Sequence, residues 1–176
     1  MLQLIITAIW LAAPAYIPNT MAVLFKGKIP IDLGKNFIDG RRVLGDGKTF
    51  RGFFGGALCG LFFGIIQINV AGLLSLPDFS GKYLVIASLA FGSMLGDLFF
   101  SFFKRRLKLQ RGSPAPVIDQ LDFLTGALFL LWVLDPVFFA SNFSPVIIII
   151  LLVITPAIHL TVNFIGFKLG KKEEPW

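Results

Sequence analysis

The sequence is poor in the side chains that most often build zinc centres and disulfides. It contains one cysteine, Cys59, and one histidine, His159. A single cysteine excludes a disulfide within the chain, Cys-x-x-Cys chemistry and cysteine-rich zinc sites. A single histidine likewise excludes a metal site with several histidine ligands. The candidate metal ligands of this chain are therefore its carboxylates.

Charged residues are also scarce, at 15% of the chain. Hydrophobic residues make up 56%, and the mean hydropathy of +0.81 is far above that of soluble proteins. This composition describes an all-α integral membrane protein, and residues 1–176 fit a single domain. Because a spanning helix needs about 20 apolar residues, we expect a bundle of five transmembrane helices, at residues 2–25, 53–76, 83–103, 118–139 and 145–167.

The basic residues divide unevenly between the connections of this bundle. Fifteen of the 16 lysines and arginines would lie on one side of the membrane, and only Lys82 on the other. Seven are in the large loop 26–51, five in residues 104–111 and three in the C-terminal tail. The positive-inside rule then predicts that the N-terminus is outside, and that the large loop and the C-terminus are cytoplasmic. The first run has no basic n-region and is too long for a signal peptide, so we expect it to be retained.

Two prolines interrupt the first run. Pro14 and Pro18 leave backbone carbonyls without helical partners and bend a helix. A membrane tolerates such breaks where the backbone is buried in protein or lines a wet cavity. Two interpretations remain open, a kink that serves packing and a ligand cavity that Asn19 lines.

The large loop contains the glycine-rich stretch GDGKTFRG, residues 45–52. Glycine-rich turns present backbone N–H groups to phosphates, and lysine and arginine supply positive charge. The stretch is not a Walker loop, because Arg42 stands where that pattern requires glycine. The alternative is a solvated basic loop near anionic lipid headgroups. The candidate nucleotide-binding residues here are Gly45, Asp46, Gly47, Lys48, Thr49 and Arg51.

Glycines recur at every fourth position in two of the expected helices. The second helix carries Gly52, Gly56, Gly60 and Gly64, and the third carries Gly92 and Gly96. Small residues at this spacing let helices approach closely. We expect these stripes to tighten the bundle around the site or to mediate contacts between protomers, and the sequence indicates no oligomeric state.

Two carboxylates lie inside apolar runs. Asp97 falls about two turns before the end of the third run, and Asp122 about one turn after the start of the fourth. If these runs form an antiparallel hairpin, the two acids face each other roughly 6–10 Å inside the apolar boundary, at 1.5 Å per residue. An acid inside a membrane segment is costly and indicates a functional site. Paired acids beneath a basic rim suggest a divalent metal that holds a phosphorylated substrate.

Further polar residues share helix faces with these acids. Asp119 lies on the same face as Asp122 and is either a helix cap or a third metal ligand. His159 and Asn163 share a face of the last helix and are either a structural pair or ligand contacts. The third helix presents one face that comprises Asp97, Ser101, Lys104 and Lys108, although its basic end is equally explained as a lipid-headgroup patch.

These motifs carry a resemblance to a known family. At GDLFFSFFKRR (residues 96–106) and DQLDF (residues 119–123), the chain resembles the archaeal CDP-archaeol synthases, relatives of the phosphatidate cytidylyltransferases. The similarity continues in PAYIPN (14–19), DGRRVLGDGKTFRG (39–52) and HLTVNFIGFKLG (159–170). The chain departs from the cytidylyltransferase signature at Gln120, where those relatives carry arginine, and it lacks their longer N-terminal helical region.

The resemblance implies that CTP and an unsaturated diether glycerol phosphate react to give CDP-archaeol and pyrophosphate, with Mg²⁺ as cofactor. The expected partners are CTP, this lipid and the bilayer, without nucleic acid. Because a lipid phosphate is already anionic near neutral pH, no strong general base is needed, and no histidine is expected near the acids. Asp97, Asp122 and Asp119 are the candidate metal ligands; the candidate catalytic residues are Asp97, Asp122, Lys104 and Arg105, and Ser101 and Asn19 are further nucleotide contacts.

Two other classes of function remain as alternatives. The first is a polyprenyl-phosphate or CDP-alcohol phosphotransferase, since residues 39–42 begin like the motif of the latter, although no matching second half follows. The second is a small cation transporter with Asp97 and Asp122 as carriers. Transporter acids usually lie near the membrane midplane, whereas these lie near its inner boundary. An active site at the cytoplasmic face therefore remains the favoured prediction.

Overall fold

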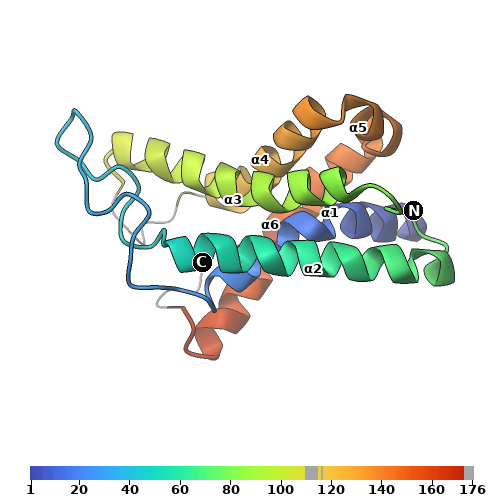
Figure 1. The fold of residues 1–176 in the computed structure, drawn as a ribbon, viewed down its shortest axis with the longest axis horizontal. Coiled ribbons are helices and arrows are strands. Elements are labelled where there is room, and N and C mark those ends of the chain that lie inside the picture. Colours follow the sequence, from blue (N-terminus) through green and yellow to red (C-terminus); the bar gives the residue numbers. More distant parts are fainter. Residues whose placement is uncertain (110–114, 116, 173–176) are drawn as a thin grey trace.

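The computed structural model describes residues 1–109, 115 and 117–172. These residues form six α-helices, and the only β-type pairing among them is two isolated bridges in the loop between the first two helices. The all-α prediction is therefore confirmed for this part of the chain, while Arg111 lies outside it. The helices are α1 (Leu2–Ala22), α2 (Phe50–Leu74), α3 (Tyr83–Arg106), α4 (Ile118–Leu134), α5 (Pro136–Asn142) and α6 (Pro145–Lys168) (Figure 1).

Four of these helices, α1, α2, α3 and α6, are long and apolar enough to cross a membrane. The expectation of one continuous helix over residues 118–139 was wrong, because the chain breaks into α4, of 17 residues, and the short α5. Pro136 has no N–H to donate and disfavours helical geometry at the residue before it. Asp135 instead caps α5, and its Oδ1 accepts a hydrogen bond from the Phe138 N–H at 2.9 Å.

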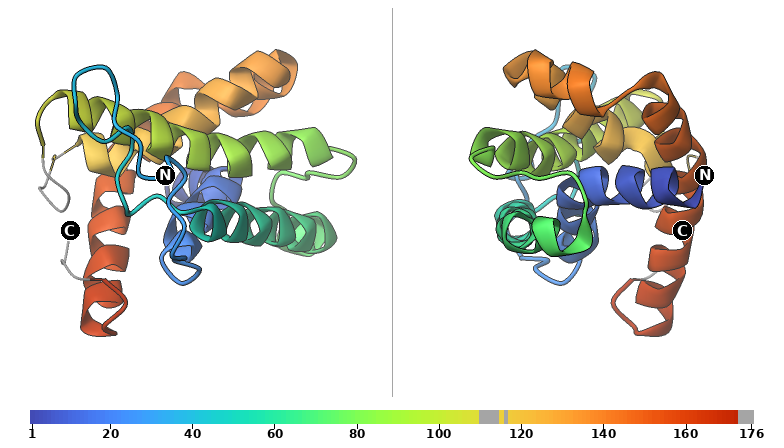
Figure 2. Two further views of the ribbon diagram at one scale, coloured as in Figure 1. Left: turned by 60° about the vertical axis from the view of Figure 1, so that its left-hand side comes forward. Right: turned by 90° about the vertical axis from the view of Figure 1, so that its right-hand side faces the viewer.

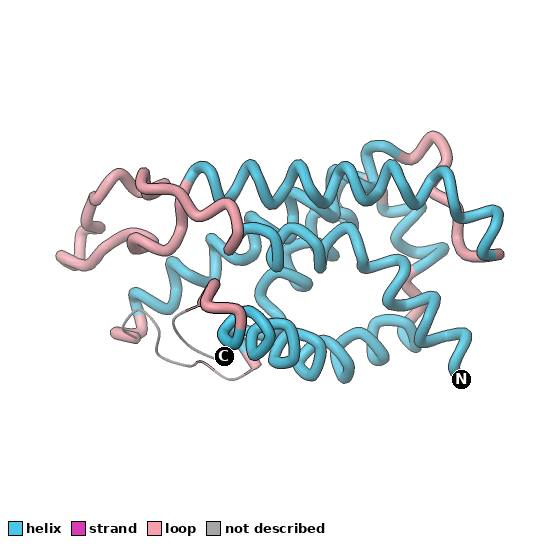
Figure 3. Tube along the Cα trace, turned by 90° about the horizontal axis from the view of Figure 1, so that it is seen from below, coloured by secondary structure: helices cyan, strands magenta, loops and turns pink. Residues whose placement is uncertain are grey.

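The helices gather the loop-rich segments at one end of the bundle. Figure 1 shows α2 and α3 running side by side, with the N-terminus and the α2–α3 connection at one end. The long loop 23–49 projects from the other end, where Figure 3 shows most of the irregular backbone. In Figure 2 the last part of α6 runs across the direction of α2 and α3. Pro156, inside α6, removes a backbone hydrogen bond and permits such a bend.

The glycine stripes lie where helices meet. A Cβ atom on Gly60 would lie 2.5 Å from the Pro18 ring and 2.8 Å from the Pro14 carbonyl oxygen, so α2 packs directly on the backbone of α1. A Cβ on Gly96 of α3 would lie 2.5 Å from the carbonyl oxygen of Asp122, and 2.8 Å from the Cα of Gly126 on α4. The prediction that the stripes bring helices into close contact is confirmed.

Side chains from neighbouring helices complete the proline-interrupted backbone of α1. Pro14 cannot donate to the carbonyl of Trp10, and this oxygen instead accepts a hydrogen bond from the buried Gln67 amide at 2.8 Å. Ser93 of α3 donates to the Ala15 carbonyl at 2.8 Å. An unpaired carbonyl in an apolar interior costs free energy, so Gln67 compensates for the hydrogen bond that Pro14 removes, and Ser93 adds a further hydrogen bond between α3 and α1.

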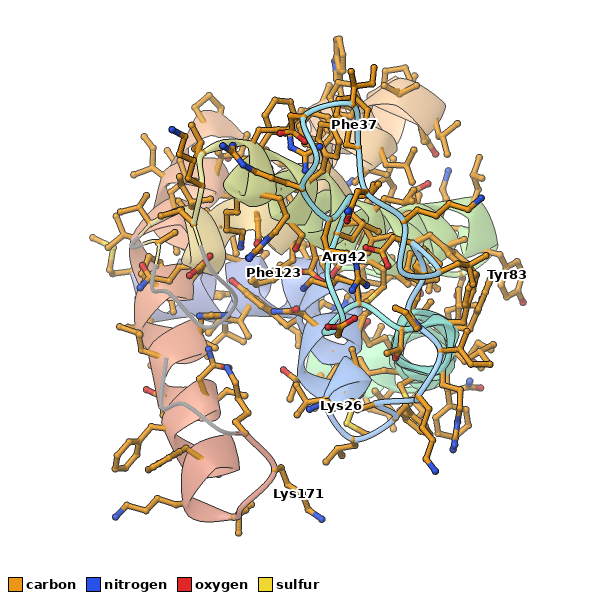
Figure 4. All side chains as sticks on the ribbon, turned by 90° about the vertical axis from the view of Figure 1, so that its left-hand side faces the viewer. Lys26, Phe37, Arg42, Tyr83, Phe123 and Lys171 are labelled. Carbon is orange, nitrogen blue, oxygen red and sulfur yellow. The ribbon has the colours of Figure 1, made fainter. Side chains whose placement is uncertain are left out.

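A buried aspartate organises the long loop. The Asp32 carboxylate accepts hydrogen bonds from the backbone N–H groups of Gly34, Leu44 and Gly45 at 2.9–3.1 Å. The Arg42 guanidinium, central in Figure 4, donates two more, at 2.7 and 3.2 Å. Burial alone would raise the pKa of Asp32, but these donors together hold the pKa well below its usual range.

The same loop is fixed to the end of α3. The Arg106 guanidinium lies between the rings of Phe37 and Phe102, 4.8 and 4.7 Å from their centroids. It also donates to the Arg42 carbonyl at 2.6 Å, while Arg41 donates to the Arg106 carbonyl at 2.9 Å. Arginine stacked on aromatic faces contributes both packing and charge. The DGRR stretch of the loop therefore anchors the loop on α3.

Candidate active site

A cavity of about 490 Å³ lies at the loop-bearing end of the bundle, the end that faces the viewer in Figure 4. Segments far apart in the sequence form its walls. They are α1, the long loop, the start of α2, the C-terminal half of α3, the start of α4, and the last part of α6 with Lys171 and Lys172 after it. Eleven residues predicted for the site line this cavity, namely Asn19, Gly45, Gly47, Lys48, Thr49, Asp97, Ser101, Lys104, Arg105, Asp119 and Asp122.

Three predicted positions lie elsewhere in the described part of the chain. Asp46 pairs with Arg42 at 2.7 Å, and the side-chain stem of Arg51 lies against Gly27. Lys108 was expected on the same helix face as Asp97, but α3 ends at Arg106 and Lys108 has a left-handed backbone, with φ of 64°. The helix that predicted this face therefore ends two residues before Lys108.

Lys48 and Asp97 form the first of two ion pairs in the cavity. The Lys48 Nζ lies 2.6 Å from both carboxylate oxygens of Asp97, whose side chain is only 12% exposed. The position of Lys48 is fixed by its neighbour Thr49, the N-cap of α2. The Thr49 hydroxyl oxygen accepts hydrogen bonds from the N–H groups of Gly52 and Gly27, at 3.2 and 3.1 Å. Thr49 therefore joins both ends of the loop and holds Lys48 over the acid.

Lys104 forms the second ion pair and bridges two acids of α4. Its Nζ lies 2.5 Å from Asp119 Oδ1 and 3.3 Å from Asp122 Oδ2. The Asp122 side chain is 3% exposed, and its other oxygen accepts the N–H of Phe123 at 2.6 Å. Asp119 also accepts the N–H of Ala115 at 2.8 Å, so it is both a helix-terminal acceptor and part of the site. Asp119 lies in the first turn of α4, whose N-cap is Val117, and its role as a third metal ligand stays a prediction.

The close contact of α3 with α4 brings the two ion pairs, one with Asp97 and one with Asp119 and Asp122, to the same cavity. Gly96 immediately precedes Asp97, and its backbone touches the carbonyl of Asp122. As the helical hairpin predicted, Asp97 and Asp122 line one cavity from facing helices. A side chain at position 96 would collide with the Asp122 carbonyl, since its Cβ would lie 2.5 Å from that oxygen. Gly96 therefore allows α3 and α4, and with them Asp97 and Asp122, to lie close together.

The carboxylates fit a magnesium ion that takes most of its ligands from a substrate. Within the described residues, no group of three or more acidic, histidine or cysteine side chains is close enough to hold a metal by itself. Mg²⁺ is commonly bound by one or two carboxylates, with water and substrate phosphates completing six oxygen ligands. Asp97 and Asp122 could supply such oxygens, and in this structure their carboxylates are paired with the ammonium groups of Lys48 and Lys104.

The cavity also contains side chains that the sequence prediction left out or placed wrongly. His159 and Asn163 line it, with the Asn163 amide 3.2 Å from the imidazole, so a histidine does lie near the acids. Its ring stacks on Phe123 at 6.1 Å between centroids. Lys26, Lys171 and Lys172 also line the cavity. Only the shared face of His159 and Asn163 was visible as a sequence signal, because the lysines enter through the loop and the tail.

A membrane-embedded helical bundle with paired carboxylates and cations in a cavity at one end defines a polytopic membrane enzyme with a site suited to phosphorylated substrates. Comparison with known proteins gives the particular family. The family model CarS-like CDP-archaeol synthase matches residues 1–176, and the chain belongs to this family.

Individual relatives agree with this assignment. The chain is 49% identical over 173 residues to the CDP-archaeol synthase of Methanococcoides burtonii, covering 93% of this chain and 99% of the relative. It is 44% identical over 181 residues to that of Archaeoglobus fulgidus, covering all of both chains. A solved intramembrane enzyme for archaeal membrane lipid biosynthesis superposes with a TM-score of 0.75 at 35% identity, covering 90% of this chain and 94% of that one.

Proposed function

We propose that the protein transfers CMP from CTP to an unsaturated archaeal diether glycerol phosphate, which yields CDP-archaeol and pyrophosphate. One observation carries this proposal: Asp97 and Asp122, each paired with a lysine, line one cavity of a chain that aligns end to end with CDP-archaeol synthases. Phosphorylated substrates need both the cations and the metal-binding oxygens that this cavity supplies.

Asp97 and Asp122, with Asp119 beside them, are the residues that would hold Mg²⁺. When bound there, the ion supplies positive charge that offsets the charge of the nucleotide phosphates. Lys48 and Lys104 would then exchange their carboxylate partners for phosphate oxygens, and Arg105 adds a third cation to this wall. The backbone of Gly45 and Gly47 lines the cavity where a nucleotide would lie.

The chemical step is an in-line displacement at the α-phosphorus. A lipid phosphate oxygen forms a bond to that phosphorus, and the bond from the phosphorus to the oxygen bridging to the β-phosphate breaks. The electron pair of this bond leaves with pyrophosphate. A phosphate monoester has a second pKa near 6, so the nucleophile is largely deprotonated at neutral pH and no protein base has to remove a proton.

An apolar groove beside the cavity provides a place for a lipid chain. It has a volume of about 290 Å³, and Lys104 lies at the boundary between this groove and the polar cavity. A lipid chain in the groove would bring its phosphate to Lys104 and the α4 acids. The groove is lined by Phe99, Phe100, Phe103, Leu107 and Ile118, together with Lys104.

Charge distribution supports a cytoplasmic site in a bundle that crosses the membrane five times. The loop and the basic end of α3 lie at the same end in Figure 1, away from the N-terminus, and Lys171 and Lys172 line the same cavity. α4 spans roughly 26 Å at 1.5 Å per residue, close to the apolar thickness of a bilayer, and together with α5 it would form the additional crossing. The positive-inside rule then assigns the N-terminus to the outside.

The test is to incubate the purified protein with CTP, Mg²⁺ and a diether glycerol phosphate, and to identify the products by mass spectrometry. The proposal expects a CDP-lipid and one pyrophosphate for each CTP consumed. Release of CMP from a CDP-alcohol without use of CTP would instead indicate a CDP-alcohol phosphotransferase. Cation uptake into liposomes without nucleotide would indicate a transporter.

A further inference from the structure

The chain reverses direction directly after α6. Gly170 has a left-handed backbone with φ of 66°, which favours glycine. The N–H groups of Lys171 and Lys172 then donate to the carbonyl of Gly166, at 2.9 and 3.3 Å. This turn directs the chain back along its own helix, and the stem of Lys172 comes to lie beside Gly166.

The turn brings Lys172 into the wall of the cavity. Lys172 is half-buried and lines the cavity together with Lys48 and Asp97. Burial lowers the pKa of Lys172, and the nearby charge of Lys48 lowers the pKa further, whereas Asp119 and Asp97 oppose this shift. Lys172 and Lys48 therefore place two positive charges on the wall of the same cavity.

Two ammonium groups held on the same cavity from separate segments favour an anion between them. Lys48 lies in the loop before α2, and Lys172 lies after α6. The two lysines therefore reach the cavity independently, from segments far apart in the sequence. Among the described residues that line the cavity, six are lysines or arginines and three are aspartates. This excess of positive charge suits a polyphosphate better than a single carboxylate or a neutral headgroup.

We infer that Lys48 and Lys172 form a subsite for the terminal phosphates of the nucleotide, the pair that leaves as pyrophosphate. This inference rests on the proposed function and assigns a part of the substrate to a part of the cavity. Lys104 borders the apolar groove, so the lipid phosphate approaches from that side. The α-phosphate lies between Lys104 and Lys48, and the β- and γ-phosphates extend toward the tail.

In the transfer step, this subsite stabilises the charge of the departing group. As the bond between the α-phosphorus and the bridging oxygen breaks, that oxygen takes the electron pair and pyrophosphate gains one negative charge. An ammonium group beside the β- or γ-phosphate stabilises that charge through a charge-assisted hydrogen bond. Lys172 therefore contributes to binding of the triphosphate and to departure of pyrophosphate, and it makes no contact with the lipid.

The experiment measures binding of CTP, CMP and inorganic pyrophosphate to the full-length protein in nanodiscs by calorimetry. Lys172→Gln is expected to weaken binding of CTP and pyrophosphate about tenfold or more and to leave CMP binding unchanged within about twofold. Lys172→Arg is expected to retain binding. Lys168→Gln is the matched control, because Lys168 belongs to the same helix end but lies over the Phe164 ring on the exposed side.

Gly170→Val provides an independent route to the same test. A β-branched residue strains a left-handed position, and no atom lies within 4 Å of the added Cβ, so the substitution acts only through the turn. It is expected to reproduce the selective loss of pyrophosphate binding. Unchanged pyrophosphate binding in Lys172→Gln, or equal weakening of CMP and CTP, would overturn the inference. If the wild-type protein binds CTP and pyrophosphate but forms no CDP-lipid, the proposed function fails while the binding comparison still decides the role of Lys172.

Discussion

Lys48 and Asp97 form a bidentate ion pair, with the lysine Nζ 2.6 Å from each carboxylate oxygen. The pair joins the long loop to the third helix at a point where the carboxylate is almost fully buried. Burying an unpaired carboxylate would cost several kcal/mol. The positive charge of the lysine compensates the negative charge of this buried carboxylate, and under the proposed function the same lysine would also contact the substrate phosphates.

Replacing Asp97 tests whether this acid is needed for transfer. Asp97→Asn is expected to reduce formation of the CDP-lipid by about a thousandfold or more, because the neutral amide no longer offers a charged oxygen ligand. The protein should remain folded, since the amide keeps the shape of the side chain. Product formation is measured by mass spectrometry, and folding by the thermal unfolding midpoint. Asp78→Asn, in the exposed α2–α3 connection, is the control, and normal activity of Asp97→Asn would remove this residue from the site.

The contact between α3 and α4 predicts a difference between two glycine substitutions. Gly96→Ala is expected to destabilise the protein by about 1–3 kcal/mol, because the new methyl group would lie 2.5 Å from the Asp122 carbonyl oxygen. Gly72→Ala, in α2, has no atom within 4 Å of the added methyl group, and it should be neutral or stabilising by roughly 0.5–1 kcal/mol. Chemical denaturation in detergent gives both values. Equal effects of the two substitutions would show that the close contact is absent.

The Asp32 cluster predicts a pH-dependent contribution to stability. Because the folded protein lowers the pKa of Asp32, its ionised form stabilises the fold above the pKa of the unfolded chain, about 3.9. This contribution is lost as the pH falls below that value toward the folded pKa. Asp32→Asn should therefore lower the unfolding midpoint at pH 7 and have a smaller effect near pH 3. A difference that stays constant between these pH values would contradict the assignment.

The apolar groove predicts a separation of substrate effects. Phe100→Ser is expected to raise the KM for the diether glycerol phosphate about fivefold to tenfold, as expected from losing part of the apolar contact of one side chain, while the KM for CTP stays unchanged. Phe62→Ser, on the outward face of α2, is the control, because Phe62 is 65% exposed and lies away from the groove. An equal rise of both KM values would show that the groove does not hold a lipid chain.

Much of the fold follows from the sequence because long apolar runs have few alternatives in a membrane. The runs that became α1, α2, α3 and α6 were located to within a few residues. The division between α4 and α5 was missed, because Pro136 lies inside an apolar run and the Asp135 cap depends on local geometry. Conversely, Pro14 does not end α1, since Gln67 from another helix satisfies the carbonyl that this proline leaves free.

The residues that could be predicted from the sequence are the acids inside apolar runs, because burying a carboxylate in a membrane segment costs free energy and therefore indicates a function. Asp97 and Asp122 are of this kind, and they line the cavity as expected. Lys172 was missed because the position of a tail depends on where its turn directs it, and a single lysine after a helix has no distinctive spacing. The stacking of Arg106 on Phe37 was missed for a related reason, since it joins two segments that only the folded chain brings together.

The direct contact of the backbones at Gly96 and Gly126 limits how this molecule moves. Two helices whose backbones touch cannot move closer together, so the acids of α3 and α4 keep a fixed position relative to each other. Under the proposed function, a change of shape that admits the nucleotide and releases pyrophosphate would then involve the other segments that line the cavity, the loop before α2 and residues 171–172 after α6. Turnover would accordingly respond to cross-linking those two peripheral segments far more than to stiffening the helices beneath them.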